Sequence, residues 1–154
     1  AQFDMVRLGI GLYGISVHPQ WRTLFEPALT WFRSVSQVKT IEKGAAVGYG
    51  RQFIANKTTT IAVIPVGYAD GYLRTLGQGK GVVYIKHQAC PTLGNVCMDM
   101  IMVDVSGLEV SEKDRVEIIG PHQTIYELAE RMGTIPYEVM TLFSSRIHRV
   151  FLDG

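Results

Sequence analysis

Short apolar stretches, separated by glycine, proline and polar turn residues, fill the middle of the chain. They are rich in valine, isoleucine and threonine, which favour strands because branched side chains pack well on a pleated surface. Strands are expected at residues 28–43, 58–66, 82–86, 98–105 and 115–119, with a last one at 147–152. Many short strands with frequent turns predict a mostly β domain, a Greek-key-like β-barrel or sandwich.

The pattern changes near the C-terminal end, where apolar residues recur at helical spacing. Thr124 is followed three residues later by Glu127, which is the spacing of a capping box, and a glycine stops the apolar repeat. A second short helix is expected over residues 134–144, with Thr134 as its cap and Pro136 in its first turn. The β domain should therefore carry two short helices.

The first residues follow another pattern. Residues 3–13 are largely apolar, with one arginine and two glycines, and indicate a buried strand that runs into a tight turn. Residues 16–27 are polar and contain two prolines, which is typical of a linker. The chain begins with alanine and enters strand-like sequence at once, so we expect a fragment of a longer protein. The expected division is residues 1–15, a linker at 16–27 and a β domain at 28–154.

Bulk composition narrows the classes of function. With 154 residues, 47% of them hydrophobic and 19% charged, the chain is long enough for one packed domain. A formal net charge of +1 gives no field that attracts nucleic acid, and no apolar run approaches the roughly 18 residues that a membrane span needs. Cys90 and Cys97 are expected as buried free thiols, and no CxxC or His–Cys cluster indicates a metal site.

A charged side chain interrupts the apolar stretch at 5–10. If Arg7 is buried there, it must be paired or hydrogen-bonded, because an isolated buried charge is costly. The glycines that follow it let backbone N–H groups approach an anion closely. An arginine that extends to the surface beside a tight turn explains the same residues equally well.

Three further stretches concentrate polar side chains at turns. Tyr49 lies between two glycines, and the alternative reading is an aromatic ring packed at a strand end. The apolar strand that ends at residue 66 is followed in the sequence by four polar or aromatic residues, Tyr68, Asp70, Tyr72 and Arg74. A β-turn with its own aspartate explains part of this cluster but not all of it. Residues 94–100 form another turn, with Asp99 at the start of a strand.

In order and spacing, these stretches resemble the alanine racemase family. The resemblance covers essentially the whole chain and is carried by MVRLGIGLYG at 5–14, GYADG at 67–71, CMD at 97–99 and GTIPYE at 133–138. It implies a pyridoxal-phosphate enzyme that interconverts L- and D-alanine for peptidoglycan. The family's N-terminal half is a (β/α)8 barrel with the lysine that holds the cofactor, and its C-terminal half is mostly β. Residues 1–14 then correspond to the last barrel strand.

The resemblance also implies roles for residues of the β domain. Tyr49 corresponds to the tyrosine base opposite the cofactor lysine, in a head-to-tail homodimer in which each C-terminal domain completes the partner's active site. Tyr68 corresponds to a tyrosine of the substrate channel, and the backbone N–H of Met98 to the group that binds the substrate carboxylate. Asp99 and Arg74 correspond to charged residues at the entrance of that channel.

Four residues correspond to cofactor contacts. Arg7 corresponds to the arginine that hydrogen-bonds the pyridine nitrogen; since arginine is effectively never deprotonated, the ring stays a weaker electron sink and side reactions are disfavoured. Gly9 and Ile10 correspond to backbone N–H groups that hold the phosphate, and Tyr137 to a tyrosine whose hydroxyl binds it. The sequence departs from the family at Asn95, where many relatives have an arginine, so the outer entrance should be less positive.

No lysine of this chain lies in the sequence context of the cofactor lysine. We therefore expect that the chain alone neither binds pyridoxal 5'-phosphate covalently nor racemises alanine, and that activity needs its own N-terminal barrel. The expected setting is the cytoplasm, and in some bacteria such a racemase is fused behind a peptidoglycan-building ligase. Two alternatives remain, a serine racemase domain and a stand-alone β module that binds a peptide or another ligand.

Overall fold

The computed structural model describes residues 4–152, and the chain divides into two compact units. The first unit is Ala1–Thr30 and the second is Trp31–Gly154. The first unit contains two 3₁₀ helices, η1 (Ile10–Tyr13) and η2 (Pro19–Leu24). The finer division into a barrel strand, a linker and a domain from residue 28 stays a prediction.

The first unit does not contain the expected strand. Residues 5–9 have no regular structure and η1 follows them, while residues 1–3 lie outside the described part. A strand is stable only when its N–H and C=O groups pair with a neighbour, and no described strand pairs with this stretch. In this unit the chain instead turns back on itself, and the N–H of Ala28 donates to the carbonyl of Tyr13 over 3.1 Å.

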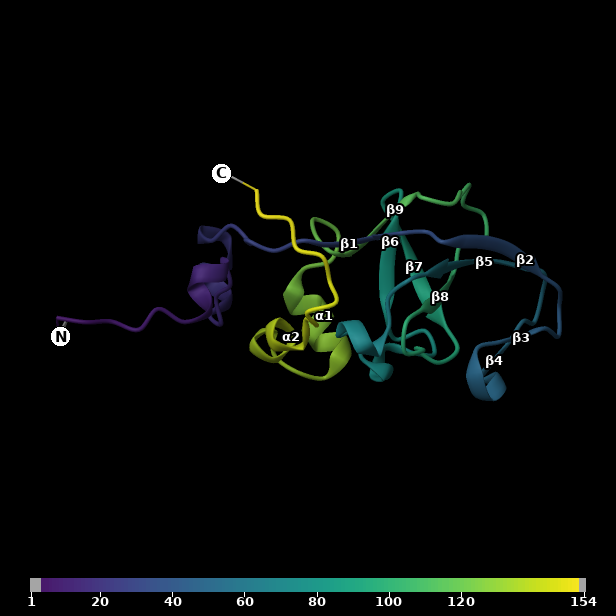
Figure 1. The fold of residues 1–154 in the computed structure, drawn as a ribbon, viewed down its shortest axis with the longest axis horizontal. Coiled ribbons are helices and arrows are strands. Elements are labelled where there is room, and N and C mark those ends of the chain that lie inside the picture. Colours follow the sequence, from purple (N-terminus) through teal and green to yellow (C-terminus); the bar gives the residue numbers. More distant parts are fainter. Residues whose placement is uncertain (1–3, 153–154) are drawn as a thin grey trace. The chain divides into compact units, whose positions relative to one another are not determined.

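Nine strands lie in the described part of the second unit, and all their pairings are antiparallel. They are β1 (Trp31–Ser34), β2 (Gln37–Ile41), β3 (Ala46–Val47), β4 (Phe53–Ile54), β5 (Thr59–Ile64), β6 (Val82–Ile85), β7 (Gln88–Leu93), β8 (Ile101–Asp104) and β9 (Arg115–Ile119). Seven form one sheet in the order β1-β9-β6-β7-β8-β5-β2, and β3 pairs with β4 (Figure 1).

Strands β1 and β2 lie at opposite ends of this order, although only Val35 and Ser36 separate them along the chain. The N–H of Val35 donates to the carbonyl of Asp114, and that of Ser36 to the carbonyl of Val63, both over 2.9 Å. The sheet must therefore curl until its two edges meet at this link, which gives a half-barrel. The mostly β, barrel-like fold is confirmed, but the single strand expected at 28–43 is two strands.

Strand β7 joins the two halves of the sheet. Its residues up to Pro91 pair with β6, whereas Thr92 and Leu93 pair with β8. The sequence did not indicate this strand, because proline lacks the N–H that a ladder uses and is depleted in strands. The segment that leaves β7 runs through residues 94–100 before β8 begins, and this segment forms much of the candidate site described below.

Helix α1 (Ile125–Met132) follows β9 and has the expected cap. The N–H of Glu127 donates to Thr124 Oγ1 over 3.3 Å, and the N–H of Thr124 donates to Glu127 Oε2 over 2.7 Å. The helix ends at Gly133, whose φ of 77° is left-handed. This capping box was predicted correctly from local spacing alone.

Helix α2 (Pro136–Leu142) packs against α1 and begins later than expected. Its cap is Ile135 rather than Thr134, because the Thr134 hydroxyl bonds the side chain of Glu138 instead of an N–H of the first turn. Residues 147–152 form no strand, and this expectation was wrong because no strand edge pairs with them. Among the described helices, none has the length and apolar character that crossing a bilayer requires.

The interior of the second unit is apolar, and both cysteines belong to it. Fully buried side chains include Ile61, Ile64, Val83, Ile85, Val103, Ile118 and Leu128. Cys90 and Cys97 are buried and free, as expected. Burial raises the pKa of the Cys90 thiol to about 11, so it stays protonated at neutral pH.

Candidate active site

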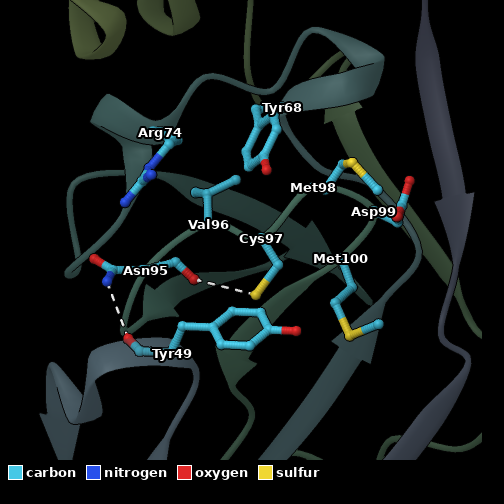
Figure 2. A pocket seen from close by; sticks show the side chains of 9 residues that line it. All are labelled: Tyr49, Tyr68, Arg74, Asn95, Val96, Cys97, Met98, Asp99 and Met100. Atoms are coloured by element: carbon cyan, nitrogen blue, oxygen red, sulfur yellow. Dashed lines mark hydrogen bonds between the residues drawn. The ribbon is translucent and has the colours of Figure 1, made fainter.

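A hollow of about 430 Å³ opens where three loops of the second unit meet (Figure 2). The loops follow β3, β5 and β7. Nine residues line the hollow: Tyr49, Tyr68, Arg74, Asn95, Val96, Cys97, Met98, Asp99 and Met100. Five residues that the sequence singled out are therefore brought together, namely Tyr49, Tyr68, Arg74, Met98 and Asp99.

Tyr49 lies between β3 and β4, in the 3₁₀ helix η3 (Tyr49–Arg51). The flanking Gly48 and Gly50 have φ angles of 74° and 72°, a conformation that side-chain-bearing residues rarely adopt. The Tyr49 side chain is 78% exposed, and Figure 2 shows its ring at the edge of the hollow, beside Cys97. A ring packed at a strand end is thus excluded, and the phenol is open to a ligand.

Asn95 holds the turn that carries Tyr49. Its Nδ2 donates to the carbonyl of Tyr49 over 3.0 Å (Figure 2). Its Oδ1 accepts from Gln78 Nε2 over 3.2 Å. From the sequence, Asn95 was notable only because many members of the resembled family have an arginine at this position. In the structure its amide fixes the backbone of the exposed tyrosine, a contact between turns that local sequence does not reveal.

The turn at 67–71 and the segment at 97–99 are joined through their backbones. The N–H of Tyr68 donates to the carbonyl of Cys97 over 3.1 Å, and the N–H of Ala69 donates to the carbonyl of Met98 over 3.0 Å. A Cβ atom added at Gly67 would lie 2.3 Å from both carbonyl oxygens. Only glycine permits this approach, so the two motifs meet because Gly67 has no side chain.

Two polar residues of the expected cluster are structural. Asp70 is buried, and its Oδ2 accepts from the N–H of Gly67 over 3.0 Å, which closes the turn on its own aspartate. Tyr72 is fully buried, and burial holds the pKa of its phenol far above the usual range. The rest of the cluster, Tyr68 and Arg74, faces the hollow.

Asp99 binds an arginine that the sequence did not indicate. Arg146 Nη2 donates to Asp99 Oδ1 over 2.6 Å, and Arg146 Nε lies 3.7 Å from Asp70 Oδ1. The hydrogen bond to Asp99 and the charge of Asp70 hold the pKa of Arg146 above its usual range. One guanidinium thus balances two carboxylates at this edge of the hollow. No local pattern could have identified it, because it follows the second helix, far along the chain.

The four expected cofactor residues do not line this hollow. Tyr137 lies in the first turn of α2 and is 43% exposed. Arg7, Gly9 and Ile10 belong to the first unit, where Arg7 is exposed and Ile10 is buried. Their expected roles stay predictions.

Comparison with known proteins identifies the chain's relatives. Residues 28–151 match the family model "Alanine racemase, C-terminal domain". The chain belongs to the alanine racemase family. It is 41% identical to the alanine racemase of Mycobacterium bovis, over 99% of this chain and 41% of that protein. It is 42% identical to that of Cutibacterium acnes, over 97% of this chain and 41% of the relative.

Solved structures of alanine racemases share the fold. The enzyme from Bacillus anthracis, solved with bound L-Ala-P, superposes with a TM-score of 0.91 at 33% identity, over 99% of this chain and 41% of that one. The enzyme from Bartonella henselae, solved with covalently bound pyridoxal phosphate, gives 0.89 at 36% identity, over 94% and 40%. The chain thus spans about two-fifths of the alanine racemases that it matches.

Proposed function

We propose that this chain is the C-terminal part of a pyridoxal-phosphate-dependent alanine racemase, and that it supplies Tyr49 as an acid–base group. The observation that carries the proposal is an exposed tyrosine, fixed by its backbone, at the mouth of a hollow that also gathers Tyr68, Arg74, Met98 and Asp99. Membership of the family supports the same reaction.

Each residue proposed to contact the cofactor, taken by itself, suits a phosphorylated ring. A Cβ atom at Gly9 would meet nothing within 4 Å, so an anion can approach the backbone closely there. Arg7 and Tyr137 are both exposed and carry groups that donate hydrogen bonds. When bound, pyridoxal phosphate supplies the electron sink that makes the Cα–H bond of an amino acid acidic. The Bartonella henselae relative holds this group covalently.

Racemisation needs a proton removed from one face of the α-carbon and a proton returned to the other face. The Tyr49 hydroxyl serves one of these faces. A phenol that acts as an acid–base group needs a neighbouring cation or hydrogen bond, and we propose that the N-terminal barrel supplies this contact. Because Tyr49 is exposed, we propose that it serves the active site of a partner subunit in a homodimer.

The remaining residues of the hollow are proposed to admit and orient alanine. The backbone N–H of Met98 is the proposed donor to the substrate carboxylate. Arg74 provides positive charge on the same wall, whereas Asp99 is balanced by Arg146. Tyr68 narrows the hollow with an aromatic ring that is 42% exposed. Together these groups are the proposed contacts for the carboxylate and side chain of an amino acid.

The test replaces Tyr49 in the full-length protein that contains this chain. Tyr49→Phe removes the hydroxyl and keeps the ring, so kcat should fall by about 10²–10⁴-fold on both L- and D-alanine while KM changes little. Tyr126→Phe, on helix α1 and outside the hollow, is the matched control. Wild-type turnover by Tyr49→Phe would refute the role. Parallel assays on serine decide the preferred substrate.

A further inference from the structure

A second hollow, of about 370 Å³, shares no lining residue with the candidate active site and contains two of the chain's four histidines. It is lined by Phe32, Tyr84, Lys86, His87, Arg115, Glu117, Pro121 and His122. His87 Nδ1 and His122 Nε2 face each other at 2.9 Å. Nothing in the proposed racemase reaction uses this pair.

Glu117 fixes the orientation of His122. Its carboxylate is buried: Oε1 accepts the backbone N–H groups of His122 and Gln123 over 2.6 and 3.2 Å, and Oε2 lies 2.9 Å from His122 Nδ1. An ionised carboxylate can only accept hydrogen bonds. The ring nitrogen beside Glu117 Oε2, which is His122 Nδ1, must therefore carry the ring proton. The lone pair on His122 Nε2 is thereby directed at His87. Tyr84 stacks on the His122 ring, with centroids 5.5 Å apart.

His87 is held in an unusual backbone conformation. It is the second residue of the two-residue turn between β6 and β7, where Lys86 and His87 have φ angles of 49° and 66°. Asparagine and glycine ordinarily occupy such positions, because other residues are strained there. Lys86 is anchored by Asp114 Oδ2 at 3.1 Å and by the carbonyl of Glu109 at 2.6 Å.

We propose that His87 and His122 form a binding site for a borderline divalent transition-metal ion such as Zn²⁺ or Ni²⁺, with Glu117 as the carboxylate that orients His122. Metal-ligating histidines commonly donate their second N–H to a carboxylate, as His122 does to Glu117. Imidazole nitrogens are the ligands that these ions favour.

The geometry needs only a small adjustment. Zn–N bonds of about 2.0–2.1 Å in a tetrahedral site place two ligand nitrogens about 3.3 Å apart. The present 2.9 Å must therefore open by about 0.4 Å, which an exposed turn residue such as His87 permits. Residues 4–152 contain no group of three or more protein ligands suited to a metal, so water must fill the remaining coordination positions.

Neighbouring charges keep the affinity modest. Lys86 and Arg115 are cations of the same hollow and oppose a bound cation. Lys86 is paired with Asp114, and the Arg115 guanidinium lies over the Phe32 ring, 3.5 Å from its centroid. The bound ion is therefore expected to exchange readily.

The first test titrates Zn²⁺ or Ni²⁺ by isothermal titration calorimetry into the untagged full-length protein that contains this chain. One ion should bind per chain, and His87→Gln and His122→Gln should each weaken binding at least tenfold. His18→Gln and His148→Gln are matched controls outside the hollow and should bind as the wild type does. If the wild type binds no ion, or if the His87→Gln/His122→Gln double variant binds equally well, the pair is only hydrogen-bonded and the proposal fails.

A second test addresses Glu117. In Glu117→Gln the amide oxygen can still accept the two backbone N–H groups, but its NH₂ donates to His122 Nδ1. The ring proton then moves to Nε2, and metal affinity should fall about 10–100-fold. Nitrogen-15 NMR of the His122 ring reports the tautomer, and circular dichroism confirms that the variant is folded. Unchanged affinity in a folded variant with the altered tautomer would overturn the orienting role; if the variant does not fold, the two histidine variants decide the proposal.

Discussion

At the scale of single residues, the role of a side chain depends on contacts that its own sequence neighbours do not specify. Asp70 and Asp99 both looked like candidates for chemistry, yet Asp70 is buried and bonds its own turn, whereas Asp99 faces the hollow and binds Arg146. Family motifs were sufficient to indicate the residues that meet around Tyr49. They did not indicate Arg146 or the contact of Asn95, because both depend on segments meeting in the fold.

Asn95→Ala should lower racemase activity without unfolding the protein. It removes the hydrogen bond to the Tyr49 carbonyl, worth about 1 kcal/mol in an exposed setting, so the phenol is held less firmly. In the full-length protein we expect kcat to fall about five- to tenfold with little change in KM. Steady-state kinetics with alanine measures this.

The matched control for that substitution is Gln78→Ala. It removes the other partner of Asn95 and leaves the bond to Tyr49 in place. Its kcat should stay close to that of the wild type. Equal losses in the two variants would show that Asn95 acts on general packing and not on the position of Tyr49.

At the scale of elements, strands with dense valine and isoleucine were predicted well, and irregular ones were not. β5, β6 and β9 lie within or at their expected ranges, since their side chains alone favour a buried pleated surface. β7 contains a proline and is stable only because β6 and β8 pair with its two ends. Residues 5–9 and 147–152 show the converse, since apolar sequence without a partner edge forms no strand.

Gly67→Ala should destabilise the second unit and disturb the hollow. The added Cβ would lie 2.3 Å from the carbonyl oxygens of Cys97 and Met98, which are backbone atoms, so one of the two segments must move. We expect the free energy of unfolding to fall by about 1–3 kcal/mol, measured by urea denaturation. Gly11→Ala is the control, because Gly11 lies inside the 3₁₀ helix η1 and the nearest atom to its added Cβ, a ring carbon of Phe25, is at 3.8 Å, an ordinary contact. Equal urea midpoints for both variants would contradict the close approach.

At the scale of the whole molecule, the proposed functions divide between the two units. The residues around Tyr49 all belong to the second unit, whereas three of the four proposed cofactor contacts belong to the first. A mostly β, barrel-like domain could be predicted from the spacing of strands and turns. The sequence did not predict that the sheet closes through the two-residue link between β1 and β2, because the order in which strands pair depends on the complete sheet.

The 154-residue chain alone should not racemise alanine. It contains no lysine in the context of the family's cofactor lysine, and it spans 41% of its Mycobacterium bovis relative. Mixed with pyridoxal phosphate, it should show no absorbance band of covalently bound cofactor and no turnover in a polarimetric assay. The full-length protein, prepared in the same way, should show both. Sustained turnover by the chain alone would refute the expectation that activity needs its own N-terminal barrel.

The short link between β1 and β2 has a consequence for synthesis. Strand β1 has no neighbour until β9, near residue 119, has been made, while β2 can pair with β5 much sooner. The nascent polypeptide therefore has one unpaired strand edge until β9 leaves the ribosome, and such an edge is prone to aggregation. Slowing elongation before residue 115 should prolong that vulnerable interval.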